Sequence, residues 1–149
     1  MIPAEERQQI IAAKTQDAEE MIAVAELNYQ HGFYNSAVNR LYYACFHMAS
    51  AALLAIGIED VHRHEGVRNM FSLHFIKAGR IGLEWKAFYG TMFSNRSNAD
   101  YDNFKSFTKE QIEEMLPLVK QFVSTLKCTV ASLEQQPSQA KPDASTEHI

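Results

Sequence analysis

The sequence is poor in the residues that build turns, cross-links and common catalytic loops. Its 149 residues include only six glycines and four prolines, too few for the hairpin turns of a β-sandwich or barrel. Its two cysteines, Cys45 and Cys128, form no C-x-x-C pair, so no disulfide framework or zinc cage can be read from their spacing. Glycine-rich phosphate loops, H-E-x-x-H and G-x-S-x-G are all absent. We therefore expect no metal site and no cofactor.

Long apolar segments are also scarce. The N-terminal residues Met-Ile-Pro-Ala-Glu-Glu-Arg lack the apolar core of a signal peptide. Residues 41–58 form a run of 18 residues without a formal charge, which reaches the lower limit for a membrane span. The run is rich in alanine and includes tyrosine, histidine and serine, which favours a helix buried inside a bundle. We therefore expect a cytoplasmic protein that does not enter a membrane.

The formal net charge of −4 hides an uneven distribution. Six acids and two bases give residues 1–31 a charge of −4, whereas six bases and two acids give residues 61–96 a charge of +4. The total excludes a protein that coats nucleic acid indiscriminately. The positive segment indicates either a confined anion site or solvated helix faces.

Apolar residues recur three or four positions apart through most of the chain, a spacing that predicts helices. The predicted helices span residues 4–30, 35–56, 64–78, 82–94 and 108–133. The second has two apolar faces and should be central, with Asn35 or Ser36 as its cap. The fifth opens with a capping box, Thr108-x-x-Gln111. No segment alternates with period two, so we predict an all-α, four- to five-helix up-and-down bundle over residues 1–134 and a disordered polar tail over residues 135–149.

The densest polar cluster, residues 94–103, falls between the fourth and fifth predicted helices. Arg96 offers a planar fork of donors for phosphate oxygens. Asp100 would orient that guanidinium or act as a base, and Tyr101 supplies a hydroxyl. The alternative is a loop in which asparagine and aspartate residues cap and turn the chain. Arg40, near the start of the buried second helix, must reach solvent or meet an acid such as Asp100.

The histidines form the second group of candidates. His62, His64 and Glu65 make an H-x-H-E cluster, and His74 follows ten residues after His64. Residues two apart on a helix point in different directions, so a metal would require His62 to lie in a loop. His47 lies beside an apolar face, where histidines are usually hydrogen-bonded core residues. We favour that interpretation over metal binding.

Five short strings, in order and spacing, resemble HEPN-domain proteins. They are Ala37-Val-Asn-Arg-Leu-Tyr-Tyr-Ala-Cys-Phe-His47, Ala52-Leu-Leu, His64-Glu-Gly-Val67, Phe75-Ile-Lys-Ala-Gly79 and Arg96-x-x-Ala99-Asp100-Tyr101. The last looks like the signature of one bacterial and archaeal branch of the family. The resemblance covers residues 4–133 and implies a helical bundle that pairs as a homodimer.

The resemblance also implies a role with RNA or nucleotides. Many relatives are ribonucleases, or the toxin half of a pair with a minimal nucleotidyltransferase. Their active site uses an arginine followed four to six residues later by a histidine, and RNA is cleaved by its own 2′-hydroxyl. Arg96 matches that arginine, but Tyr101, Asp102 and Asn103 stand where the histidine should fall. No side chain there has a pKa near neutrality.

We therefore expect a nucleotide- or RNA-binding module that works with a nucleotidyltransferase partner in a toxin–antitoxin type of system. The candidate phosphate-binding residues are Asn39, Arg40, Tyr43, Asn95 and Arg96. One alternative is a metal-independent RNA-cleaving toxin in which Asp100 and Tyr101 assist Arg96, aided by His47 or His64 brought in by folding. Another is a non-catalytic structural dimerisation protein. Some family members are adenylylated on a tyrosine close to the motif, which makes Tyr101 the candidate here.

Overall fold

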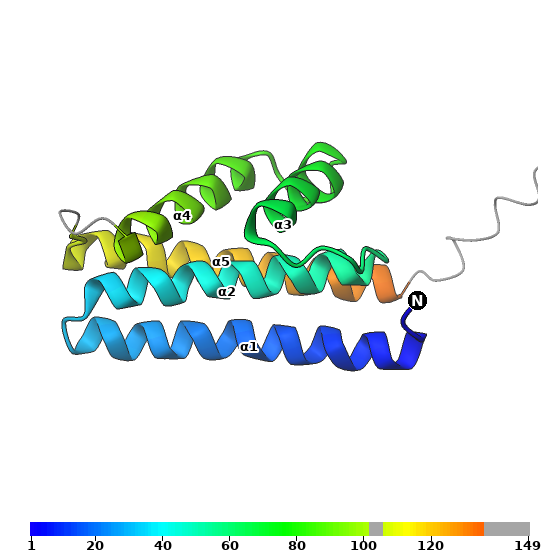
Figure 1. Ribbon diagram of the computed structural model, residues 1–149, viewed down its shortest axis with the longest axis horizontal. Helices are drawn as coiled ribbons and strands as arrows, with labels where there is room; N and C mark the ends of the chain where they lie inside the picture. Colours follow the sequence, from blue (N-terminus) through cyan, green and yellow to red (C-terminus); the bar gives the residue numbers. More distant parts are fainter. Residues whose placement is uncertain (102–105, 136–149) are drawn as a thin grey trace, which may run out of the picture.

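Five α-helices and one π-helical segment make up the part of the chain that the computed structural model describes, residues 1–101 and 106–135. The elements are α1 (Ala4–Gln30), α2 (Tyr34–Ala55), α3 (His64–Phe71), the π-helix η1 (Ser72–Lys77), α4 (Glu84–Tyr101) and α5 (Lys109–Glu134). No strand occurs in these residues. Helices α1, α2 and α5 run side by side, and α3 and α4 lie across them (Figure 1). The predicted all-α bundle is confirmed, and the bounds of α1 are those predicted.

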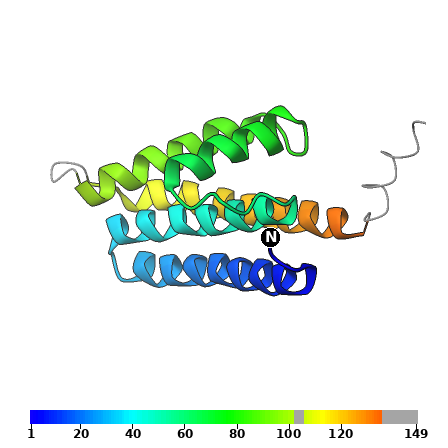
Figure 2. The same cartoon turned by 45° about the vertical axis from the view of Figure 1, so that its right-hand side comes forward.

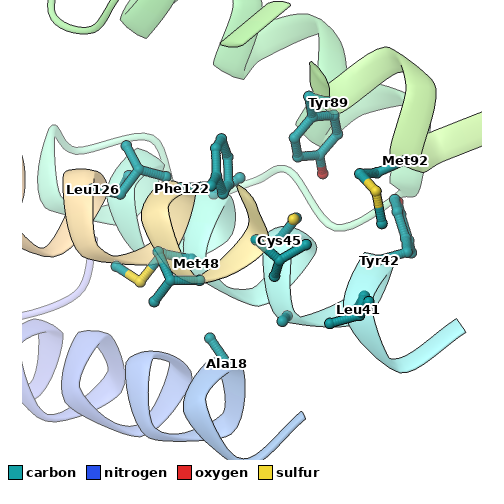
Figure 3. Close-up of a cluster of buried hydrophobic side chains, with 14 of the residues drawn as sticks. Ala18, Leu41, Tyr42, Cys45, Met48, Tyr89, Met92, Phe122 and Leu126 are labelled. Atoms are coloured by element: carbon teal, nitrogen blue, oxygen red, sulfur yellow. The ribbon is translucent and has the colours of Figure 1, made fainter. Parts of the chain in front are cut away.

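Helix α2 is the centre of the bundle. It packs against α1, α3, α4 and α5, and 12 of its 22 residues are buried. Figure 3 shows side chains of α2, including Cys45 and Met48, facing α1, α4 and α5. Small residues such as Ala44 and Ala52, both fully buried, let neighbouring helices approach closely. This surrounding protein explains the uncharged run of residues 41–58. Within the described part of the chain, no helix is both long and apolar enough to cross a membrane.

The start of α5 is fixed as predicted, and the start of α2 is not. The Thr108 hydroxyl accepts from the Gln111 amide, and the Gln111 side chain accepts from the Thr108 amide, which completes the capping box. Neither Asn35 nor Ser36 caps α2, because the helix already begins at Tyr34. Asn35 instead accepts a hydrogen bond from the Phe107 amide at 2.9 Å through its side-chain oxygen. That bond ties the segment before α5 to the first turn of α2.

The predicted third helix is two elements. The α-helical turns of α3 give way at Ser72 to the π-helix η1, which ends before Gly79. Gly79 has a φ of 83°, a left-handed conformation that glycine adopts without steric cost. π-helical turns are rare and occur often at functional sites.

The fourth helix is longer than predicted. Helix α4 continues to Tyr101, so residues 94–101 are helical and do not form an interhelical loop. The buried positions Tyr89, Met92 and Arg96 continue the spacing of three and four residues past Ser94. Asp102 and Asn103 lie outside the described residues, as does the predicted tail beyond Gln135. For Asp100 and Tyr101, only the place in the helix is described.

The two cysteines lie in opposite environments. Cys45 is fully buried on α2, and this burial raises the pKa of its thiol far above the ordinary value. Cys128, on α5, is exposed. Both thiols are free in the structure.

Candidate functional site

Arg96 is the one buried charged side chain in the described part of the chain. It is 8% exposed, on the face of α4 that packs toward α2. Its guanidinium carbon lies 5.1 Å from the centre of the Tyr42 ring and 5.9 Å from that of Phe93. Both distances are within the range of cation–π attraction. Rings from both α2 and α4 therefore contact the arginine side chain.

His64 reaches the same group from the first residue of α3. Its Nδ1 atom lies 2.9 Å from the hydroxyl oxygen of Tyr42. Its ring centre is 4.6 Å from that of Phe46 and 5.6 Å from that of Tyr43. Folding thus places a histidine next to Tyr42, and the ring of Tyr42 also contacts the Arg96 guanidinium. The cluster of Tyr42, His64, Phe93 and Arg96 is called the Arg96 cluster below.

The electrostatics of the Arg96 cluster keep His64 neutral. Partial burial lowers the pKa of His64 below its ordinary value, and the positive charge of Arg96 lowers it further. Burial raises the pKa of Tyr42 to about 12, so its hydroxyl keeps its proton at neutral pH. When the Tyr42 hydroxyl donates to Nδ1 of His64, the imidazole carries its own proton on Nε2. The half-exposed histidine then presents that nitrogen as its second polar atom.

A second arginine shares the Phe93 ring. The guanidinium carbon of Arg68 lies 4.8 Å from the ring centre. A Cβ atom at Gly90 would lie 3.1 Å from the Nη2 atom of Arg68, so the glycine permits the close packing of this side chain on α4. Two guanidinium groups, from α3 and α4, therefore lie near the Phe93 ring. Two of the six bases in the positive segment of residues 61–96 thus come together in the fold.

The other predicted phosphate-binding residues lie near the Arg96 cluster but do not all join it. Asn39 and Arg40 line a shallow hollow of about 300 Å³ together with Ala99, one helical turn beyond Arg96. Arg40 was expected either to reach solvent or to meet an acid, and its side chain is exposed to solvent. Its Nη1 atom lies 3.6 Å from the sulfur of Met21.

Tyr43 is the predicted site residue that joins the aromatic group around His64. Its ring centre lies 5.2 Å from that of Tyr42. Asn95 is half-buried and precedes Arg96 by one position, so it points about 100° away around α4. The side chains of Asp100 and Tyr101 lie outside the described residues.

Of the two histidines named as candidates for assistance, His64 belongs to the Arg96 cluster, through its hydrogen bond with Tyr42. His47 lies one turn further along α2, with its ring centre 6.1 Å from Tyr43 and 5.8 Å from Phe46. Burial lowers the pKa of His47 as well, with Lys14 acting in the same direction and Asp17 opposing it. His47 is thus a packed residue beside the site.

Three participants were missed as site residues: Tyr42, Phe93 and Arg68. The signal for Tyr42 was its place in the Ala37–His47 string, directly before the predicted Tyr43. No sequence pattern indicated Phe93. No group of three or more histidine, cysteine, aspartate or glutamate side chains in the described residues has the geometry to hold a metal ion.

Comparison with known proteins agrees with the sequence resemblance. A sequence model of the HEPN domain matches residues 13–129. A UPF0332 protein from Thermotoga maritima is 32% identical over 130 residues, which cover 87% of this chain and 98% of the relative. Two Methanocaldococcus jannaschii proteins, each named "Putative toxin", are 33% identical over 117 residues and 34% identical over 99 residues. These alignments cover 78% of this chain and 86% of the first relative, and 66% of this chain and 67% of the second. The chain belongs to the HEPN family.

Proposed function

We propose that this HEPN protein is a toxin-type module that binds RNA or a nucleotide through phosphate contacts at the Arg96 cluster. The observation that carries the proposal is the position of Arg96, held over Tyr42 and Phe93 on the face of α4 turned toward α2. Two relatives named as toxins support the same kind of module.

The chemistry of the Arg96 cluster suits a phosphodiester. A guanidinium donates up to two parallel hydrogen bonds to phosphate oxygens, and its charge strengthens each of them. The packing of Arg96 against two rings reduces the conformational freedom that phosphate binding would otherwise cost. The hollow lined by Asn39 and Arg40 would extend the contact along the backbone of the ligand. The Tyr43 ring, which lies beside His64, offers a stacking surface for an unpaired base.

RNA cleavage is the second candidate, because His64 lies in the same cluster as Arg96. In this reaction the ribose 2′-oxygen forms a bond to the neighbouring phosphorus, and the bond from phosphorus to the 5′-oxygen breaks. A base removes the 2′-proton, and an acid protonates the leaving 5′-oxygen. His64, with a pKa lowered from an ordinary value of about 6.5, is neutral at pH 7 and suited to the first step. Arg96 would stabilise the charge on phosphorus, with Asp100 and Tyr101 as further candidates.

Variants of Arg96 and His64 separate the two candidates. Total RNA and a labelled single-stranded RNA are incubated with wild-type protein, Arg96→Gln and His64→Gln. The controls are Arg80→Gln, another arginine outside the Arg96 cluster, and the exposed His31→Gln. Binding that weakens in Arg96→Gln alone supports the binding module. Cleavage that is lost in both site variants and kept in both controls supports the ribonuclease. If neither binding nor cleavage depends on Arg96, the structural dimerisation protein is the remaining interpretation.

We further propose a cytoplasmic location, together with the homodimer and the small nucleotidyltransferase partner that the family resemblance implies. Size-exclusion chromatography with light scattering measures the oligomeric state, and a monomer at micromolar concentration would contradict the dimer. Co-expression with a nucleotidyltransferase encoded in a neighbouring gene tests the partner. Mass spectrometry of the co-expressed protein tests adenylylation, and an unmodified Tyr101 peptide would rule out that site.

A further inference from the structure

A separate cavity is lined by residues of α3, η1 and α4. Helices α3 and α4 lie on the same side of α2 (Figure 2). Its volume is about 460 Å³, within the range of about 300–1,000 Å³ that small-molecule sites occupy. Neither Arg96, His64 nor Tyr42 lines it. The cavity is therefore distinct from the Arg96 cluster.

Part of the cavity lining is apolar. Phe71, Ile76 and Tyr89 line it and are at most 3% exposed, so they belong to the core. Leu83 also lines the cavity but is 75% exposed, and Leu73 is 48% exposed. Exposed leucines beside a hollow with a buried aromatic floor offer an apolar body a place to bind and lose contact with water.

The charged residues of the cavity lining are all cationic. Arg68, Lys77 and Lys86 line it, and no acidic side chain is among the described residues that do so. Asn69 and Ser72 add uncharged donors. Three positive charges around one hollow favour an anion of more than one charge. A phosphate monoester carries about −1.5 to −2 at neutral pH, whereas a carboxylate carries only −1.

Two local features position these groups. Arg68 lies against Gly90 and over Phe93, so its guanidinium is set in place before any ligand arrives. Lys77 comes from the π-helix η1, which also supplies Ser72, Leu73 and Ile76 to the wall. A rare helical form thus provides much of the wall of the cavity, which agrees with the frequent occurrence of such turns at functional sites.

We propose that this cavity binds a small organic phosphate monoester, with the phosphate held by Arg68, Lys77 and Lys86 and an apolar or aromatic body against Phe71 and Leu83. The site is additional to the RNA or nucleotide phosphate contact proposed for Arg96. It does not depend on that proposal, because Tyr42, His64 and Arg96 do not line the cavity, although Arg68 adjoins both sites by packing on Phe93.

Isothermal titration calorimetry with two probes tests the site. Adenosine monophosphate supplies an aromatic body and hexyl phosphate an aliphatic one, and binding of either at millimolar concentration or below is expected. Inorganic phosphate and adenosine are the comparison ligands, since each has only one of the two features. Equal binding of inorganic phosphate or adenosine would overturn the proposal, as would no binding of either monoester.

The cation contribution is tested with Lys77→Gln/Lys86→Gln. Both lysines are exposed, so the fold should persist, and circular dichroism verifies this. Affinity should fall about tenfold or more. The matched control, Lys109→Gln/Lys120→Gln, removes two exposed charges outside the cavity and should bind like wild type. Unchanged affinity in the cavity variant, or an equal loss in the control, would refute the assignment.

Arg96→Gln distinguishes the two proposals. If monoester binding persists in Arg96→Gln while RNA binding is lost, both sites exist as described. If monoester binding persists and RNA binding is unaffected by Arg96→Gln, the cavity stands and the proposed function fails. If monoester binding is lost in Arg96→Gln but kept in the lysine double variant, the ligand occupies the Arg96 cluster and the cavity proposal fails.

Discussion

Replacing Tyr42 by phenylalanine removes one oxygen atom from the Arg96 cluster and leaves the ring in place. The lost contacts are the hydrogen bond of 2.9 Å to Nδ1 of His64 and the interaction with the Tyr89 hydroxyl. A typical intramolecular hydrogen bond contributes about 0.5–1.5 kcal/mol to stability. His64 is only partly buried, so water can reach Nδ1 in the variant. The Tyr89 hydroxyl, by contrast, is buried and loses its interaction with Tyr42, and a buried unsatisfied group costs about 1–3 kcal/mol. The free energy of unfolding should therefore fall by about 1–3 kcal/mol.

Urea unfolding followed by circular dichroism measures this change as a lower midpoint with an unchanged slope. Tyr29→Phe is the matched control, because its hydroxyl also bonds a side chain, Glu113, but at the surface, and it should shift the midpoint less. RNA binding should stay close to wild type in Tyr42→Phe, since phenylalanine keeps a ring beneath Arg96. A loss well above 3 kcal/mol, or a variant as stable as wild type, would refute the reasoning.

Three further predictions concern stability. The pKa values of His47 and His64 are lowered in the fold, so below a pH of about 6.5 the unfolded chain binds more protons and stability falls as the pH decreases. In a double variant, His47→Gln/His64→Gln, the urea midpoint should depend less on pH between pH 7 and 5. A pH dependence equal to that of wild type would contradict this. Thr108→Ala breaks the capping box with Gln111 and should cost about 1 kcal/mol by urea unfolding, and a loss near zero would show that α5 needs no cap. Phe122→Ala empties a fully buried position among four aromatic rings and should cost about 3–5 kcal/mol, and a loss below 1 kcal/mol would contradict the packing described.

Helices with regular apolar spacing and clear end signals could be predicted from the sequence. The bounds of α1 match those predicted, and Thr108 caps α5 with Gln111 as the motif indicates. The local sequence determines these features because each end is set by residues within one turn. The start of α2 could not be predicted in this way, because Asn35 bonds the distant Phe107 amide and does not cap its own helix.

The error at α4 has a physical cause that bears on the site. The buried stripe of this helix continues through Arg96, a residue type that a hydrophobicity pattern counts as solvent-exposed. The apolar pattern therefore lapses where the helix actually continues. Arg96 packs against the rings of Tyr42 and Phe93, and Tyr42 comes from another helix. The approach of His64 likewise depends on the packing of α3 against α2, which no local pattern encodes.

Because the two cysteines differ in exposure, thiol labelling of the natural chain can measure how often the bundle opens. A thiol-reactive dye should label the exposed Cys128 at once, while Cys45 is shielded at the centre of α2 and its thiol resists ionisation. Because α2 contacts four other helices, Cys45 reacts only when the bundle opens. The rate at which a second label appears thus reports opening of the whole bundle, without any substitution in the chain.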